Sequence, residues 1–215
     1  YLEGQKKPKN FIEKDINIKI ISPKISINEY LNKDPKYRIM SLIKLSNPKE
    51  KERTLFIFPE GTLSGIHLDD LYIYKDLLRN NFSKNHKLVF GINTNKGSKI
   101  YNSLVVFDNN IKVIDQYDKN KLVPFGEFLP FENILSNLGI KKITQGYTSF
   151  SSSNERKLIN IDEILVLPLI CYEIIYTGKL FQNKKDFDLI LNISEDGWFG
   201  NPIGPHQHFA HSIFR

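Results

Sequence analysis

A single cysteine, Cys171, stands in the stretch LPLICYEIIY, directly after a run of apolar residues. Two other reactive side chains hold similar positions: Glu60 follows the apolar run LFIFP, and Lys119 follows the second arm of a predicted hairpin. A thiol is mostly protonated at neutral pH, and a nearby carboxylate can accept its proton as a general base. A lysine cation can stabilise both the thiolate and the oxyanion of a tetrahedral intermediate, and the backbone N–H of Tyr172 could be a second oxyanion donor. The three residue types together indicate nucleophilic acyl chemistry.

Each of these residues also has a purely structural explanation. A cysteine at the end of a strand is commonly a small packed hydrophobe. A glutamate after a proline is commonly part of a solvated turn, and a lysine in a basic segment commonly lies at the surface. Residue type and spacing leave both explanations open.

The elements that would position these residues are strands that alternate with helices. Apolar and β-branched runs predict strands, and apolar residues at helical spacing predict helices. We expect strands at 16–22, 53–60, 87–94, 163–173 and 188–194, a hairpin over 102–119 that turns at 108–110, and helices within 31–53, 69–82 and 206–215. This order predicts an α/β layered sandwich and not a purely doubly wound sheet. The ends of its buried strands can converge at one edge of a sheet, where loops on a rigid scaffold carry chemistry.

The composition predicts one globular domain. The chain has 215 residues, of which 40% are hydrophobic and 12% aromatic, too apolar for a disordered protein. We expect a linker from a preceding membrane region at 1–15 and a catalytic domain over 16–215. Because the chain begins with Tyr1 and ends inside a predicted helix, we expect a C-terminally truncated piece of a longer polypeptide. It contains no apolar run long enough to cross a membrane.

The net charge of +6 fits a solvated lysine-rich surface, a nucleic-acid site or a surface for anionic lipids. Nucleic-acid binding ranks last, because the aromatic residues lie mostly in apolar runs and no RNA-binding signature is present.

One cysteine excludes an internal disulfide. His206, His208 and His211 stand close together, but only the last two share a helix face and no acidic residue lies among them. We therefore expect no metal, and we expect His67 and His86 in turns or at the surface.

Four phrases together carry a resemblance to a known family: FPEGT (58–62), YDKNKLVPFGEFLP (117–130), LICYE (169–173) and NISEDGWFGNPIGPHQHF (192–209). In this order they resemble the nitrilase (carbon–nitrogen hydrolase) superfamily. The phrases KLVPFGEFLP and DGWFG followed by GPHQHF are most similar to its membrane-embedded branch, the apolipoprotein N-acyltransferases. The resemblance implies an α-β-β-α sandwich.

The resemblance also implies roles for particular residues. Cys171 would be the nucleophile, Glu60 the general base and Lys119 the oxyanion stabiliser. Glu127 would be a second essential carboxylate, which holds Lys119 or moves protons.

Further residues would support the site or bind substrate. Tyr172 and Glu173 would complete the loop around the thiol, and Trp198 would line the site or the substrate entry. Phe125 lies in the apolar segment 124–140, which is either a loop with its aromatics tucked into the core or a partly exposed lid that meets the bilayer.

The implied reaction transfers an acyl chain from a phospholipid, such as phosphatidylethanolamine, through a cysteine thioester to the N-terminal lipid-modified cysteine of an apolipoprotein. It needs no cofactor. The catalytic domain would face the periplasm from the bacterial inner membrane, with membrane-spanning helices outside residues 1–215. A soluble nitrilase-type amidase, with the same Glu60, Lys119 and Cys171 but water as acceptor, is the alternative.

Overall fold

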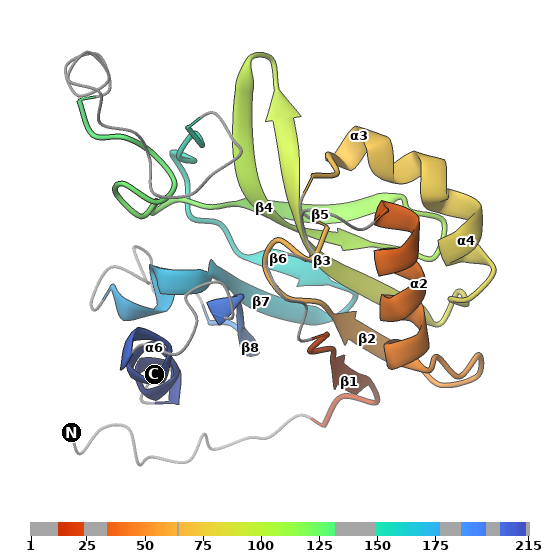
Figure 1. The fold of residues 1–215 in the computed structure, drawn as a ribbon. Helices are drawn as coiled ribbons and strands as arrows, with labels where there is room; N and C mark the ends of the chain where they lie inside the picture. The colour runs from red at the N-terminus through yellow and green to blue at the C-terminus, as the bar shows by residue number, and fades with distance from the viewer. Residues whose placement is uncertain are drawn as a thin grey trace.

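The larger of two β-sheets carries most of the fold. The computed structural model describes residues 13–23, 34–63, 65–131, 149–176, 186–196 and 203–213 (Figure 1). In this part of the chain, β1 to β3 run parallel, whereas β3, β4 and β5 pair antiparallel. The strands lie in the order β1 (Asn17–Ile20), β2 (Thr54–Ile57), β3 (His86–Lys96), β4 (Lys99–Phe107) and β5 (Val113–Asp118).

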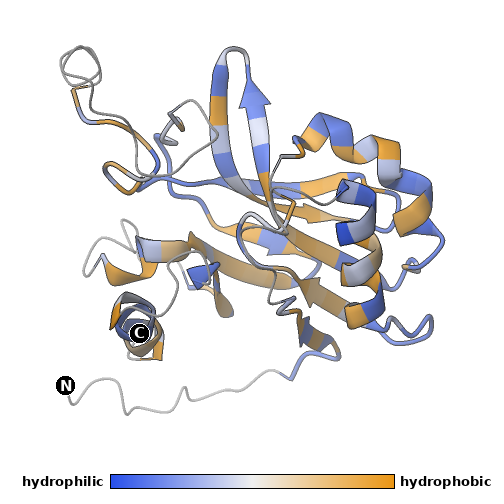
Figure 2. Cartoon of the chain, viewed as in Figure 1, coloured by the Kyte–Doolittle hydropathy of each residue, from blue (hydrophilic) through white to orange (hydrophobic). Residues whose placement is uncertain are grey.

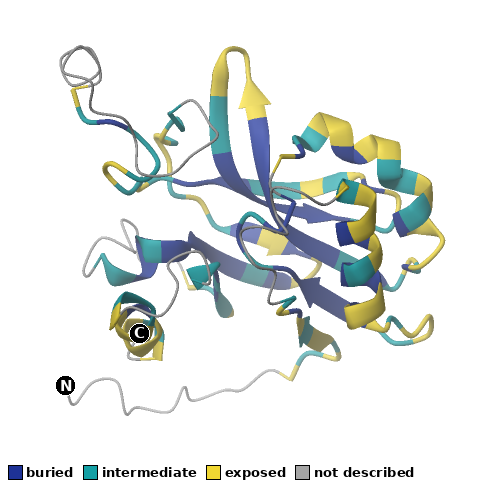
Figure 3. Ribbon diagram, viewed as in Figure 1, coloured by how far each residue is buried: buried dark blue, intermediate teal, exposed yellow. Residues whose placement is uncertain are grey.

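A smaller sheet packs against one face of the larger one. Its strands are β6 (Ile159–Ile161), β7 (Ile164–Ile170) and β8 (Leu189–Ile193), with β7 and β8 parallel. Leu55, Leu104 and Val166 belong to the apolar core between the two sheets. Figure 3 shows that the central strands of both sheets are buried.

Helices cover the opposite face of the larger sheet. They are α2 (Pro35–Ser46), α3 (Leu68–Leu71), the 3₁₀ turn η2 (Tyr72–Tyr74) and α4 (Lys75–Arg79). Phe56 and Phe58 of the β2 segment point into this helical core, whereas Leu55 and Ile57 point toward the second sheet. Because both faces are buried, the run LFIF is apolar without alternation. The hydropathy colouring in Figure 2 shows the same apolar strands beneath mixed helices.

Two further helical elements follow the strands of the smaller sheet. The 3₁₀ helix η3 (Cys171–Ile175) begins directly after β7, and α6 (Ile203–Ile213) packs against it. A helical layer, two sheets and α6 beside the second sheet confirm the predicted α/β sandwich.

Several local expectations are confirmed and others need correction. The hairpin at 102–119 is present as β4 and β5, with the Asp108 side chain accepting hydrogen bonds from the backbone N–H groups of Asn110 and Lys112. The strand expected at 87–94 is longer and forms a second hairpin with β4, which turns at Gly97 with φ of 60°.

The helix expected within 31–53 is limited to α2, and the one expected over 69–82 is divided among α3, η2 and α4. His86, expected in a turn or at the surface, is fully buried. In the described ranges, no helix is both long enough and apolar enough to span a bilayer.

Candidate active site

Glu60, Lys119 and Cys171 all lie just beyond the carboxyl ends of strands. Lys119 follows β5 directly, Cys171 follows β7 directly, and Glu60 lies in the turn after β2. The three residues are only 4%, 1% and 6% exposed, respectively. Glu60 is therefore not part of a solvated turn, and Lys119 is not a surface lysine.

The Lys119 ammonium lies between two carboxylates. Its Nζ donates to Glu60 Oε1 at 3.2 Å and to Glu127 Oε1 at 2.8 Å. Burial alone would lower the pKa of Lys119, but the charges of Glu60 and Glu127 more than offset it, so the pKa is raised and the side chain stays a cation. This is the electrostatic arrangement that an oxyanion stabiliser requires.

Asn102 fixes both carboxylates against the lysine. Its Nδ2 donates to Glu60 Oε1 at 2.7 Å and to Glu127 Oε1 at 2.9 Å. Glu127 is also held by the backbone N–H of Val123, 2.9 Å from its Oε2. Sequence reasoning did not find Asn102, because it lies inside β4 and nothing in its neighbourhood along the chain marks it.

The Cys171 thiol is in contact with Glu60 and Ser194. Burial raises the pKa of the thiol well above its usual range, and the Glu60 charge raises it further, whereas Lys119 and a hydrogen bond with Ser194 act in the opposite direction. The thiol is thus protonated at rest, with a carboxylate beside it that can accept the proton.

The backbone around the thiol has two special features. Cys171 has a φ of 55°, a conformation that costs a non-glycine residue about 1–3 kcal/mol and recurs at functional sites. On β3, a Cβ at Gly91 would come within 2.6 Å of the Glu60 Cα and 2.7 Å of the Pro59 carbonyl oxygen. Glycine at position 91 therefore lets the Glu60 turn pack directly on β3.

Glu173 ties together the two strand ends that carry Lys119 and Cys171. It is fully buried. Its carboxylate accepts from the backbone N–H groups of Asn120 and Lys121 at 3.0 and 2.9 Å, and from Ile170 N–H at 3.0 Å. The Tyr117 hydroxyl also donates to it, at 2.9 Å. These contacts join the segment that carries Cys171 to the one that carries Lys119, and a role for Glu173 in the reaction stays a prediction.

The remaining predicted support residues differ in how the structure places them. The Tyr172 ring stacks on His208, with ring centroids 4.7 Å apart. Phe125 has a φ of 63° and is 42% exposed, and Phe131 farther along the same segment is 79% exposed. Trp198 lies outside the described residues, as does most of the segment 124–140.

A cavity of about 340 Å³ lies at the ends of β1, β2 and β8, and its lining includes neighbours of Glu60 and Cys171 but not these two residues themselves. The segments after β1, β2 and β8 line it, and it includes Pro59 beside Glu60 and Ser194 beside the thiol. Apolar side chains such as Ile21 and Phe58 form part of its wall. Polar and acidic residues, among them Ser22, Glu195 and Asp196, form the rest, so the cavity is mixed in polarity.

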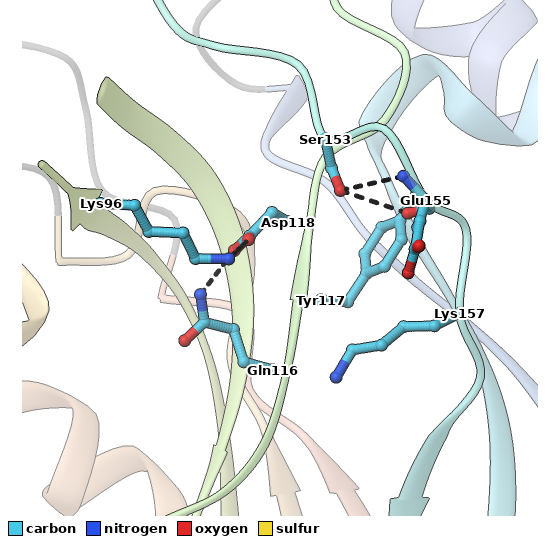
Figure 4. A pocket seen from close by; sticks show the side chains of 7 residues that line it. All are labelled: Lys96, Gln116, Tyr117, Asp118, Ser153, Glu155 and Lys157. Atoms are coloured by element: carbon cyan, nitrogen blue, oxygen red, sulfur yellow. Dashed lines mark hydrogen bonds and ion pairs between the residues drawn. The ribbon is translucent and has the colours of Figure 1, made fainter. Parts of the chain in front are cut away.

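A second cavity, of about 280 Å³, is polar and contains none of the predicted site residues. Figure 4 shows its lining side chains turned toward one another, with Lys96 and Gln116 both bonded to Asp118. Among the described residues, no group of acidic, histidine or cysteine side chains could hold a metal ion.

The fold and the strand-end residues define a class of protein. Residues 35–213 match the model of the carbon-nitrogen hydrolase family, and the chain belongs to this family. Two solved structures share the fold. They are a CN-hydrolase superfamily protein from Xanthomonas campestris (TM-score 0.50, 15% identity, 75% of this chain and 60% of that chain) and a glutamine-dependent NAD⁺ synthetase from Acinetobacter baumannii (TM-score 0.51, 18% identity, 92% and 35%).

Within this class, the chain is similar to particular curated proteins. It is 43% identical over 118 residues to the apolipoprotein N-acyltransferase of Rhizobium rhizogenes and 42% identical over 119 residues to that of Rhizobium leguminosarum bv. trifolii. The matched segments make up 54% and 55% of this chain and 22% of each relative.

Proposed function

We propose that this chain is the catalytic domain of an acyltransferase that moves an acyl chain from a phospholipid to the N-terminal lipid-modified cysteine of apolipoproteins. The observation that carries the chemistry is the buried contact among Glu60, Lys119 and the Cys171 thiol. The similarity to proteins named apolipoprotein N-acyltransferase supports the choice of donor and acceptor.

In the first half-reaction, the Cys171 sulfur attacks the carbonyl carbon of a phospholipid ester while Glu60 accepts the thiol proton. Lys119 stabilises the oxyanion of the tetrahedral intermediate. When the C–O bond breaks, Glu60 returns the proton to the departing alkoxide, so a lysophospholipid leaves and a thioester remains.

In the second half-reaction, the free α-amino group of the acceptor attacks the thioester carbonyl. Glu60 takes a proton from the attacking nitrogen, the C–S bond breaks, and the proton returns to sulfur. The products are an amide and the resting thiol, so Glu60 and Cys171 end unchanged. Glu127 keeps Lys119 charged and in place throughout.

The proposed setting is the periplasmic face of the bacterial inner membrane. Acyl chains have to leave a bilayer to reach the thiol, and the exposed Phe125 and Phe131 offer apolar contact to it.

Transfer and hydrolysis can be distinguished in one experiment. The full-length protein is incubated with a phospholipid that carries a labelled acyl chain and with a lipopeptide whose N-terminal cysteine is diacylglyceryl-modified. We expect labelled amide on the lipopeptide and none on its N-acetylated counterpart. Labelled free fatty acid with no amide would instead support a hydrolase and contradict the proposal.

A matched pair of lysine variants tests the role of Lys119. Lys119→Met should reduce transfer by about 100-fold or more, because one preorganised oxyanion donor is lost. Lys121→Met changes an exposed neighbour and should leave transfer unchanged. Equal activity of the two variants would remove Lys119 from the mechanism.

A further inference from the structure

His208 links the backbone of Cys171 to an acidic side chain. The ring is 2% exposed. Its Nε2 lies 3.0 Å from the Cys171 carbonyl oxygen, and its Nδ1 lies 3.0 and 2.9 Å from the two Asp196 carboxylate oxygens. Stacking on Tyr172 fixes the plane of the ring.

The contacts continue from Asp196 to the thiol. Ser194 Oγ donates to Asp196 Oδ1 at 2.8 Å, and the same serine forms a hydrogen bond with the Cys171 side chain. Ser194, Asp196 and His208 therefore form a chain of contacts that starts at the sulfur of Cys171 and returns to its carbonyl oxygen.

The two partners of the His208 ring define its protonation state. A carbonyl oxygen only accepts hydrogen bonds, and an ionised carboxylate also only accepts. Each ring nitrogen must then carry a hydrogen, so the ring is an imidazolium. In a neutral ring with hydrogen on Nε2, the lone pair of Nδ1 would face the Asp196 carboxylate.

The charges that face the ring agree with this assignment. The hydrogen bond to Asp196 raises the pKa of His208, against the effect of burial, and the Glu60 charge acts in the same direction as Asp196. Burial tends to raise the pKa of Asp196, but its bonds with His208 and Ser194 lower it below the ordinary value. The pair is thus ionised from below the ordinary pKa of an aspartate to above that of a histidine.

The carbonyl of Cys171 matters because of the peptide plane to which it belongs. In a trans peptide, the C=O of one residue and the N–H of the next point in opposite directions. Holding the Cys171 carbonyl toward His208 therefore directs the Tyr172 N–H away from it. The same bond supports the positive φ of Cys171, which its side chain disfavours.

We propose that Ser194, Asp196 and His208 are positioning residues for the nucleophile, in which a doubly protonated His208 holds the Cys171 carbonyl and so orients the thiol and the Tyr172 N–H. This proposal deepens the proposed acyl transfer and rests on Cys171 being its nucleophile. His208 itself touches no reacting atom in this account.

The first test measures the protonation of His208 directly. The full-length protein is labelled with ¹⁵N at histidine, and the imidazole nitrogens are followed from pH 5 to pH 9. We expect both His208 nitrogens to be protonated at pH 7 and to lose the Nδ1 proton only at higher pH. A neutral His208 ring at pH 7 would overturn the proposal.

Variants at position 208 test the link to Cys171. His208→Phe keeps the stacking on Tyr172 but removes both donors, and we expect thioester formation at Cys171 to fall by about 10-fold or more. His208→Gln keeps a donor that can reach the carbonyl. It should recover part of the loss and remove the alkaline pH dependence that His208 causes. Wild-type rates in His208→Phe would overturn the proposal.

Controls separate this proposal from the proposed function. His211→Phe changes an exposed histidine on the same helix and should behave as wild type. The His208 resonances are assigned as those missing from the His208→Gln variant, in which the other histidines keep theirs, so the assignment does not depend on the folding of His208→Phe. If the wild type forms no acyl-enzyme but His208 is an imidazolium and His208→Phe changes the rate of Cys171 alkylation by iodoacetamide, acyl transfer fails while the positioning role stands.

Discussion

At the scale of single residues, the resting thiol is held in the protonated form. Burial and the neighbouring Glu60 charge raise the pKa of Cys171, and only Lys119 and Ser194 oppose them. A solvent-exposed cysteine would be ionised in part without substrate and would react with many electrophiles. In the proposed mechanism, the sulfur becomes nucleophilic when Glu60 accepts its proton, which would couple ionisation to the presence of a bound ester.

This coupling predicts opposite pH effects for two substitutions. Glu60→Gln removes the base, so acylation by phospholipid should fall by about 10²–10⁴-fold. The same change removes a charge that raises the pKa of the thiol, so alkylation of Cys171 by iodoacetamide should begin at lower pH than in the wild type. Measuring the alkylation rate against pH checks this expectation.

Lys119→Met should shift the alkylation profile the other way. The lysine charge lowers the pKa of the thiol, and its loss leaves Glu60 unopposed, so alkylation should begin at higher pH. If the alkylation profiles of Glu60→Gln and Lys119→Met shifted in the same direction along the pH axis, one of these two side chains would not act on the thiol as described.

At the scale of secondary-structure elements, the site depends on how closely the turn after β2 approaches β3. A Cβ at position 91 would lie within 3 Å of backbone atoms of Pro59, Glu60 and Gly61, so only glycine fits there without displacing them. Gly91→Ala should displace Glu60 and reduce acylation of folded enzyme by roughly 100-fold, since an error of about 1 Å in a catalytic group costs that much.

A second glycine provides the control for Gly91. Gly97→Ala strains a turn with φ of 60°, but a Cβ there meets nothing. It should reduce stability by about 1 kcal/mol without changing acylation per folded molecule. If Gly91→Ala lost no more activity than Gly97→Ala, the close approach of the Glu60 turn would not matter for the reaction.

The sequence predicted the elements with the strongest apolar patterns. Runs such as LFIF and ILVLPLI read as buried strands because both of their faces pack against apolar layers. The β3–β4 hairpin was not predicted, because its turn region is polar and extends beyond the apolar part of the strand. The helix expected over 69–82 has its apolar residues on the predicted face, although local geometry divides it into three short pieces.

The residues of the candidate site also fall into those that the sequence indicates and those that only the structure reveals. Glu60, Lys119 and Cys171 could be proposed because each ends a recognisable strand, and Glu127 and Glu173 because they stand in phrases that resemble a family. Asn102 stands in none of these phrases, and 42 residues separate it from Glu60. His208 stands in one of them, but nothing in the phrase indicates its contact with Cys171, 37 residues away. Only the packed structure brings them together.

At the scale of the whole molecule, the site lies where the two sheets meet. Glu60 and Lys119 come from the larger sheet, and Cys171 and Ser194 from the smaller one. The apolar core between the sheets therefore sets the distance from the base and the lysine to the thiol. Any loss of packing there should affect both stability and activity.

Leu104→Ala tests this dependence. Leu104 is fully buried in the core between the sheets. Its truncation should reduce the free energy of unfolding by about 2–5 kcal/mol. Leu45→Ala, at a position 52% exposed on α2, should cost far less. Urea denaturation compares the two, and equal midpoints would argue against a shared core between the sheets.

The most direct test of the central claim is a mass measurement. The full-length protein is incubated with phospholipid in the absence of an acceptor, and the mass of the peptide that contains Cys171 is then determined. The account predicts a mass increase of one acyl chain on Cys171. Hydroxylamine should release this chain, and Cys171→Ala should lack the adduct. Transfer of acyl chains by the Cys171→Ala variant, or by a wild type that never carries the adduct, would contradict the account.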